Sequence, residues 1–253
     1  MDAVTFESRN DIAYITLNRP AALNTFNGAM FHELNEAVDR FRDDSSLKVA
    51  ILSGQGARAF SAGVDLKAMQ VDLEAGRTNK VPHMIRFAEQ GYCNKPLIAA
   101  IRGYCVGEGV HAVLGCDFRV CASDAIFYVP EVAVGMALAR LSWQCVRAIG
   151  LPAATELCLL CEKKDAQWAL AHQLVHKVTA PGEEMATAEK IAERLCTMSM
   201  PALQATKQTL QKAYELSYQE MLDFGFPLRA QVLAAGDATR RTQAFLDKKG
   251  SKG

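Results

Sequence analysis

Two short turns of small residues stand where this sequence could hold a reacting group. The turn SAGVD at 61–65 follows the apolar run VAILSG at 49–54. The turn GEG at 107–109 follows a second apolar run, LIAAIRG at 97–103, and precedes an apolar helical pattern. Small residues leave backbone N–H groups facing open space, and a helix N-terminus adds positive partial charge. If the two turns converge, their N–H groups form an oxyanion hole, and the glycines keep side chains away from the reacting carbonyl.

Two titratable residues lie close to these turns in the sequence. Glu131 follows the apolar run AIFYV, and partial burial there favours the protonated carboxyl and suits it to proton transfer. His111 comes two residues after the second turn, near the expected helix N-terminus, where an imidazole tends to stay neutral and can accept a proton. A histidine that only packs beside a pocket fits the same position equally well.

Two other motifs fit their surroundings poorly. The string GEGVHA at 107–112 resembles a dinucleotide fingerprint, but only about seven residues separate Gly109 from the polar break at Asp117, too few for a crossover helix. Cys158, Cys161, His172 and His176 have a zinc-like spacing, yet they lie in an apolar helix-forming run without a hairpin. We therefore predict buried helix cysteines and a surface histidine pair, and no metal site.

Strand-like and helical runs alternate along the first part of the chain. Strands are expected at 3–8, 11–17, 49–54, 97–103, 117–122 and 125–129. A helix is expected from Asn27 to Arg42, with Met30, Phe31, Leu34, Ala37, Val38 and Phe41 on one buried face. This alternation predicts an α/β fold with much of its sheet buried. The polar segment from Gln70 to Pro82 predicts a mobile surface loop near the site.

The chain after Thr187 is almost entirely helical in pattern. Pro201, Pro227 and Gly236 are expected to break it into pieces. We therefore predict a core of residues 1–186 and a helical C-terminal region of residues 187–253. Apolar residues of that region form either an oligomerisation surface or a face packed on its own core: Met221, Leu222, Phe224, Phe226 and Leu228.

Composition narrows the classes of protein to consider. Lys+Arg and Asp+Glu are balanced at 28 each, which gives no basic signal for nucleic acid. No apolar stretch approaches the roughly 20 residues that span a bilayer, so no membrane partner is expected. The first residues lack a secretory signal, and most of the eight cysteines sit within apolar runs, which predicts a reduced cytoplasmic protein.

Taken together, these segments resemble the crotonase family, the enoyl-CoA hydratase/isomerase superfamily, over nearly the whole chain. The landmarks are LNRPAALNTF (17–26), AFSAGVDLKAM (59–69), KPLIAAIRGYCVGEGVHAVLGCDFRVC (95–121), FYVPEVAVG (127–135), QLVHKV (173–178) and GDATRRTQAFLDKK (236–249). The resemblance implies a spiral of ββα units and a helical C-terminal trimerisation region, in a homotrimer or dimer of trimers. It also implies an acyl-CoA thioester substrate and no cofactor beyond the coenzyme A that the substrate carries.

The family's functional positions can be transferred to this chain by its motifs. The oxyanion donors would be the backbone N–H groups of Val64 and Glu108, and the principal catalytic carboxylate would be Glu131. Because an anion beside a developing enolate opposes it, we expect the Glu108 carboxylate to point away from the site. The residues that match the family's CoA channel are Ala22, Leu23, Ala62, Asp65, Leu66 and Lys67.

Departures from the family pattern affect the predicted activity. His111 stands where hydratases have a second glutamate, so the pair that handles water would be Glu131 and His111. Arg140, Leu141 and Trp143 replace small residues and predict a reshaped acyl pocket. The resemblance favours an enoyl-CoA hydratase. A Δ3,Δ2-enoyl-CoA isomerase, which needs one carboxylate, and a catalytically silent CoA-binding protein remain as alternatives.

Overall fold

Two sheets form the centre of the molecule in the computed structural model, which describes residues 2–75 and 84–250. The larger sheet has the order β1-β2-β3-β5-β7-β10, and the smaller one β4-β6-β8-β9. The strands of the larger sheet are β1 (Val4–Arg9), β2 (Ile12–Leu17), β3 (Val49–Gly54), β5 (Leu97–Ile101), β7 (Phe118–Ala122) and β10 (Lys177–Thr179). Those of the smaller are β4 (Ala59–Ser61), β6 (Tyr104–Val106), β8 (Ile126–Tyr128) and β9 (Lys164–Asp165).

A strand–strand–helix unit repeats three times along the chain. The units are β3-β4-α2 (Leu66–Glu74), β5-β6-α3 (Glu108–Leu114) and β7-β8-α4 (Arg140–Leu159). In each unit the first strand joins the larger sheet and the second joins the smaller. In the second and third units, each strand lies beside the equivalent strand of the preceding unit and parallel to it. This arrangement is the predicted spiral of ββα units, and the predicted α/β class is confirmed.

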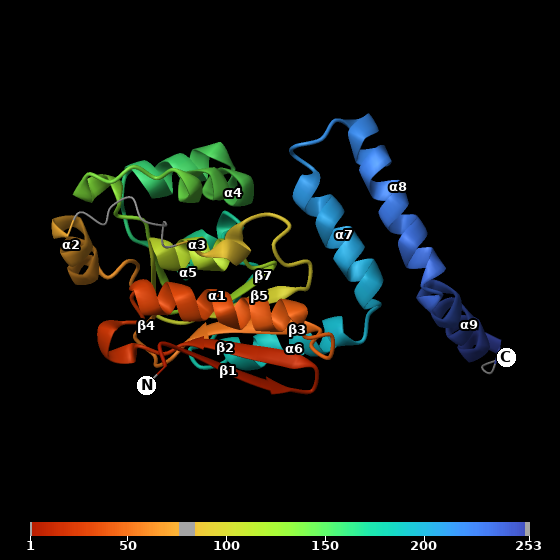
Figure 1. Ribbon diagram of the computed structural model, residues 1–253. Helices are drawn as coiled ribbons and strands as arrows, with labels where there is room; N and C mark the ends of the chain where they lie inside the picture. Colours follow the sequence, from red (N-terminus) through yellow and green to blue (C-terminus); the bar gives the residue numbers. More distant parts are fainter. Residues whose placement is uncertain (1, 76–83, 251–253) are drawn as a thin grey trace.

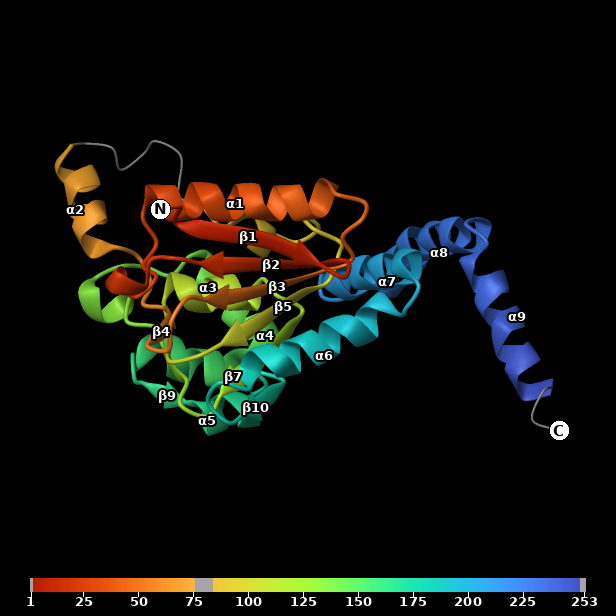
Figure 2. The ribbon, with the colours of Figure 1, turned by 90° about the horizontal axis from the view of Figure 1, so that it is seen from below.

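Helices cover both faces of the larger sheet. Figure 2 shows α1 (Gly28–Asp43) along one face and α6 (Glu184–Cys196) along the other. The predicted helix at 27–42 is confirmed, since Asn27 caps α1 by accepting a hydrogen bond from the Met30 N–H. All six residues predicted for its buried face are buried. Strand β5 is buried at every position, as expected for a parallel strand between two helix layers.

Four helices form the C-terminal part: α6, α7 (Met200–Lys212), α8 (Tyr218–Ala234) and α9 (Asp237–Gly250). The division predicted at residue 187 falls inside α6, and Ala188, Ala192 and Leu195 of this helix pack on the sheet. In Figure 1, α8 and α9 extend away from the body, and none of the residues described in α8 is buried.

The expected breaks in this part agree with the structure at two positions of three. Pro201 lies in the first turn of α7, and Gly236 separates α8 from α9. The predicted break at Pro227 is wrong, because α8 continues through it. The helix is exposed there, so water can hydrogen-bond the carbonyl that the proline cannot.

The segment predicted as a surface loop is partly helical. Residues 70–74 belong to α2, so the loop prediction is wrong for them, and residues 76–82 lie outside the described residues. Within the described part of the chain, no helix is long and apolar enough to cross a bilayer. All eight cysteines are free and six of them are buried.

Candidate active site

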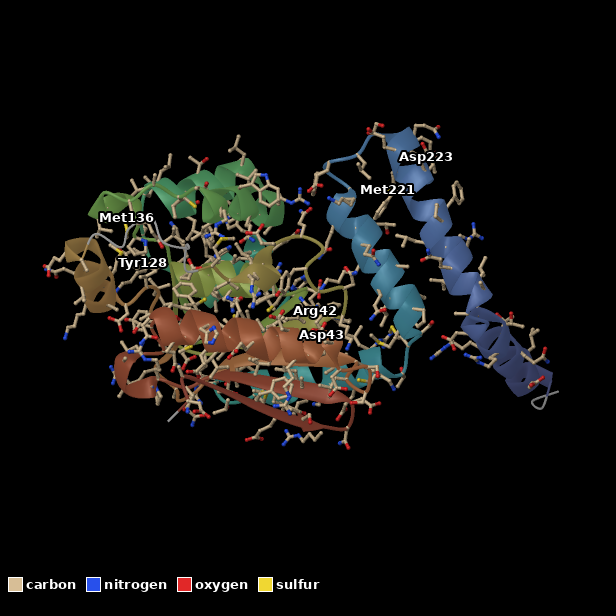
Figure 3. All side chains as sticks on the ribbon, in the orientation of Figure 1. Arg42, Asp43, Tyr128, Met136, Met221 and Asp223 are labelled. Carbon is tan, nitrogen blue, oxygen red and sulfur yellow. The ribbon has the colours of Figure 1, made fainter. Side chains whose placement is uncertain are left out.

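A cavity of about 310 Å³ lies where the two small-residue turns meet the start of α4. Predicted site residues from four different segments line it: Ala62, Val64, Leu66, Glu108, His111, Glu131, Arg140 and Leu141. Met136, which also lines the cavity, is labelled in Figure 3 near Tyr128, at the end of the molecule where α2 and the start of α4 lie. The fold therefore brings both turns and both candidate catalytic side chains to one place.

The first turn is held by backbone hydrogen bonds on either side of Val64. The Phe26 N–H donates to the Gly63 carbonyl (2.8 Å), and the Asp65 N–H donates to the Phe26 carbonyl (2.9 Å). The Ser61 hydroxyl donates to the Asn24 carbonyl (2.8 Å) and fixes the base of the turn. Within residues 2–75 and 84–250, the Val64 N–H has no hydrogen-bond acceptor, so it is available to a ligand.

The second turn begins α3 and presents an N–H in the same way. The Gly107 N–H donates to the Tyr128 carbonyl (2.9 Å), and the His111 N–H donates to the Gly107 carbonyl (3.1 Å). The Glu108 N–H, in the first turn of the helix, has no acceptor among the residues that the structure describes. It adds a second unpaired donor, with the positive end of the helix behind it.

The two glycines of the second turn are explained by close approach. A Cβ atom on Gly107 would lie 2.3 Å from Oε1 of Glu131, and Gly107 has a φ of +50°. A Cβ atom on Gly109 would lie 3.0 Å from both Cβ and the carbonyl oxygen of Ser61. The first glycine therefore makes room for the Glu131 carboxyl, and the second lets the two turns pack together.

Glu131 is partly buried at the start of η3 (Val132–Val134). Its Oε2 atom is buried and has no hydrogen-bond partner in the described part of the chain. Burial, with a smaller contribution from the charge of Glu108, raises the pKa of the Glu131 carboxyl above its usual value. A raised pKa favours the protonated form of this carboxyl, which can give its proton to a bound molecule.

His111 and Glu108 are in direct contact inside the cavity. Nδ1 of His111 lies 2.9 Å from Oε1 of Glu108, and the two side chains are only 3% and 19% exposed. The expectation that the Glu108 carboxylate points away from the site is therefore wrong. The two residues are three apart on α3, a spacing that places side chains on the same face of a helix.

Several predicted residues lie outside this cavity. Ala22 ends η1 (Pro20–Ala22), and Leu23 lines a separate cavity of about 340 Å³ with Arg58. Leu23 still borders the first turn, because its carbonyl accepts a hydrogen bond from the Ala62 N–H (2.9 Å). Lys67 is exposed on α2 and does not line the Glu131 cavity.

Asp65 and Trp143 do not line the cavity that contains Glu131. The Asp65 carboxylate forms an ion pair with Arg19 (3.1 Å) and accepts a hydrogen bond from the Ala68 N–H in the first turn of α2 (3.3 Å). Trp143 is half-exposed and lines a cavity of about 540 Å³ with residues of α7, where the Arg147 guanidinium lies over its ring. The structure thus brings Arg140 and Leu141 to the Glu131 cavity, but not Trp143.

Part of the cavity wall was not predicted. These residues come from β6, the segment after β8 and the approach to α4: Val106, Pro130, Val134, Met136, Ala137, Leu138 and Ala139. They directly precede Arg140 or flank Glu131 and Gly107, and this adjacency is the only sequence signal for them. Arg140 itself forms an ion pair with Glu89 (3.2 Å), a residue that does not line this cavity.

The zinc-like residues do not form a metal cluster. Cys158 is buried in α4, His172 packs against the Trp168 ring, and Nδ1 of His176 accepts a hydrogen bond from the Arg119 N–H (3.1 Å). Over residues 2–75 and 84–250, no three His, Cys, Asp or Glu side chains are grouped so that they could hold a metal ion.

This combination of ββα spiral, paired turns and buried carboxyl agrees with comparisons to known proteins. The sequence profile of the enoyl-CoA hydratase/isomerase family matches residues 7–252. The chain therefore belongs to this family, and the resemblance predicted from its motifs is confirmed.

Individual relatives are similar along their whole length. A short-chain-enoyl-CoA hydratase of Clostridium acetobutylicum is 30% identical, with 100% of this chain and 98% of the relative covered. A 2,3-dehydroadipyl-CoA hydratase of Escherichia coli is 33% identical, with 98% and 97% covered. The crystal structure of an enoyl-CoA hydratase from Mycobacterium tuberculosis aligns with a TM-score of 0.89 at 32% identity, covering 98% of this chain and 97% of that one.

Proposed function

We propose that this protein is an enoyl-CoA hydratase that uses Glu131 and His111 to add water across an activated double bond. One observation carries the proposal: residues around a single cavity supply two backbone N–H donors without an acceptor among the described residues, a partly buried carboxyl with a raised pKa and a histidine. These are the groups that conjugate addition of water to a thioester requires: donors for the enolate oxygen, an acid for C2 and a base for the water.

The reaction follows from these roles. The thioester oxygen accepts hydrogen bonds from the N–H groups of Val64 and Glu108, which stabilise the enolate as it forms. His111 takes a proton from water while the water oxygen bonds to C3, and protonated Glu131 gives its proton to C2. The product leaves His111 protonated and Glu131 ionised, and transfer of one proton from the histidine to the carboxylate restores the starting state. The scheme needs no group besides the CoA thioester.

The remaining predicted residues are assigned to substrate binding. Ala62 and Leu66 line the cavity, Leu23 borders the first turn, and Ala22, Asp65 and Lys67 lie on the segments that flank that turn. We assign these residues to the channel for coenzyme A. Arg140 and Leu141 are assigned to the acyl pocket, because both line the cavity that contains Glu131.

An isomerase is the second candidate, and one observation favours it. Oε2 of Glu131 is buried and unpartnered in the described residues, while Oε1 lies beside Gly107. A single carboxyl so placed can move a proton between C4 and C2 of a 3-enoyl-CoA without help from His111.

The same proposal includes the assembly and the compartment. Large exposed apolar side chains lie along α7, the turn that follows it and α8, and α8 extends away from the body: Leu210, Tyr214, Tyr218, Phe226 and Leu233. Burial of this surface between subunits would support a homotrimer or a dimer of trimers. The eight free cysteines support a cytoplasmic location, because thiols stay reduced there.

Paired assays test the proposed activity. Hydration of crotonyl-CoA and isomerisation of a 3-enoyl-CoA are measured for the wild type, Glu131→Gln and His111→Ala, with the exposed Glu36→Gln on α1 as a control. We expect Glu131→Gln to lower kcat of either reaction by about 10²-fold or more. We expect His111→Ala to abolish hydration only. Undiminished hydration by His111→Ala would favour the isomerase, and a wild type inactive on both substrates would favour a silent CoA-binding protein.

A further inference from the structure

We propose that the Glu108 carboxylate is a positioning residue for His111: it accepts the hydrogen of Nδ1 and so leaves Nε2 as the unprotonated nitrogen that takes a proton from water. This role rests on the proposed hydration reaction. It gives Glu108 two separate tasks, since its backbone N–H serves the oxyanion hole while its side chain orients the base.

The geometry of the contact supports a defined hydrogen bond rather than an incidental surface pair. Nδ1 of His111 and Oε1 of Glu108 are 2.9 Å apart, and both side chains are largely buried at 3% and 19% exposure. The chain offers a contrasting pair on α1, where His32 and Glu36 are 3.3 Å apart with exposures of 72% and 62%. Water screens the α1 pair, whereas the charge in the cavity acts at close range with little screening.

The chemistry of the partner determines the tautomer. An ionised carboxylate can only accept hydrogen bonds, so the nitrogen that faces it must carry the hydrogen. Neutral imidazole has one protonated nitrogen, and therefore Nε2 keeps its lone pair. Among the described residues Nε2 has no hydrogen-bond partner, which leaves it free to bind the attacking water.

The same contact resolves the conflict between Glu108 and the enolate. Other charged or titratable groups on the cavity wall are Glu131, from the segment after β8, and Arg140, from the start of α4. Burial raises the pKa of Glu131 and so favours its neutral form, which carries no opposing charge. When His111 takes the proton of water it becomes a cation beside Glu108, and the pair is then neutral at the moment the enolate develops.

Nuclear magnetic resonance reports the tautomer directly and independently of activity. Long-range proton–nitrogen spectra of the full chain with labelled histidine distinguish the two neutral tautomers, and the spectrum of His111→Ala assigns the His111 signals among the five histidines. We expect the wild type to carry the hydrogen on Nδ1 of His111. In Glu108→Gln the amide can donate or accept, so we expect a mixture. A wild type with the hydrogen on Nε2 would overturn the proposal.

Kinetics of matched variants complete the test. Glu108→Gln should lower kcat for hydration by about 10-fold to 100-fold, by analogy with the loss of the hydrogen-bond partner of a metal-binding histidine, with little change in KM. It should also shift the acid limb of the kcat–pH profile, and Glu108→Asp should recover part of the rate. Glu36→Gln, which removes the partner of an exposed histidine, should change neither.

The outcomes separate this inference from the proposed function. If His111→Ala is inactive in hydration while Glu108→Gln keeps the wild-type kcat and pH profile, the positioning role is wrong and the hydratase stands. If His111→Ala hydrates as well as the wild type, the proposed base is wrong. In that case the wild-type tautomer still decides whether Glu108 holds the Nδ1 hydrogen.

Discussion

Replacement of Gly107 by alanine should separate the position of the Glu131 carboxyl from its chemistry. The added Cβ atom would lie 2.3 Å from Oε1 and 3.3 Å from Cδ of Glu131. Cβ atoms essentially never approach another heavy atom closer than 3.0 Å, so the carboxyl must retreat by at least 0.7 Å. The variant therefore keeps the catalytic group and moves it.

The size of the effect follows from that displacement. A misplacement of about 1 Å at a reacting centre costs on the order of 10²-fold in rate, so we expect kcat to fall by a factor of about 10 to 100. A second cost falls on stability, because alanine disfavours the backbone of Gly107, with φ +50° and ψ −111°. Such strain costs about 1–3 kcal/mol, which the fold can tolerate.

The assay compares kcat with urea unfolding at one protein concentration. Gly91→Ala is the matched control, because Gly91 has a φ of +77° and a Cβ atom there meets nothing within 4 Å. It should lose stability without losing kcat. A Gly107→Ala enzyme with kcat within about twofold of the wild type would refute the placement of Glu131 as the proton donor.

A double-mutant cycle shows which group Gly107→Ala acts through. If the loss arises from the displaced Glu131 carboxyl, the same substitution should cost little in a Glu131→Gln background, where the proton donor is already absent. Equal losses in both backgrounds would mean that the backbone N–H of Glu108 had moved instead.

Three further predictions concern stability, assembly and the composition of the site. Because burial raises the pKa of Glu131, the folded protein keeps this proton where the unfolded chain releases it, and stability from this group falls as pH rises above the ordinary value of 4.5. Urea unfolding should therefore show Glu131→Gln gaining on the wild type as the pH rises above 4.5; parallel curves would contradict this. Light scattering should give a multiple of three subunits for the wild type and a smaller mass for Phe226→Glu with Leu233→Glu, whereas a monomeric wild type would remove the assembly. His111→Glu alone should hydrate poorly, because the new carboxylate lies beside those of Glu108 and Glu131, and adding Glu108→Gly should raise the hydration rate. A double variant slower than His111→Glu would show that the Glu108 carboxylate does not disfavour a glutamate at position 111.

Local patterns predicted the large elements of the fold well. Helix α1 has both an Asn27 cap and a continuous apolar face, so two independent signals agree. Strand β5 is a continuous apolar run because helices cover both sides of the sheet. The short strands β4 and β6 were missed, since three residues show no periodicity and such a strand is defined only by its pairing with neighbouring strands. The helix break predicted at Pro227 is wrong because α8 is exposed there, so water can hydrogen-bond the carbonyl that lacks the proline N–H as a partner.

The sequence predicted which residues lie at the site but not where their side chains point. Motif resemblance located Val64, Glu108 and Glu131, and the structure brings them to one cavity with His111. Trp143 was assigned to the acyl pocket with Leu141. Side chains two positions apart on an α-helix point in directions that differ by about 200° around its axis, so Trp143 faces α7 instead. The direction of a side chain depends on packing between elements, which single-chain spacing does not contain.

The Glu108 side chain illustrates how one contact can reverse an argument from charge. Considered alone, a carboxylate next to an oxyanion hole opposes the enolate, and that reasoning predicted an outward side chain. The helical spacing of three residues instead joins it to His111 at 2.9 Å, inside the cavity. The relevant charge is then that of the pair, which is negative while His111 is neutral and becomes neutral when the histidine takes a proton. A carboxylate that orients the base before the reaction, and whose charge is balanced by the histidine as the enolate forms, favours the transition state over the ground state.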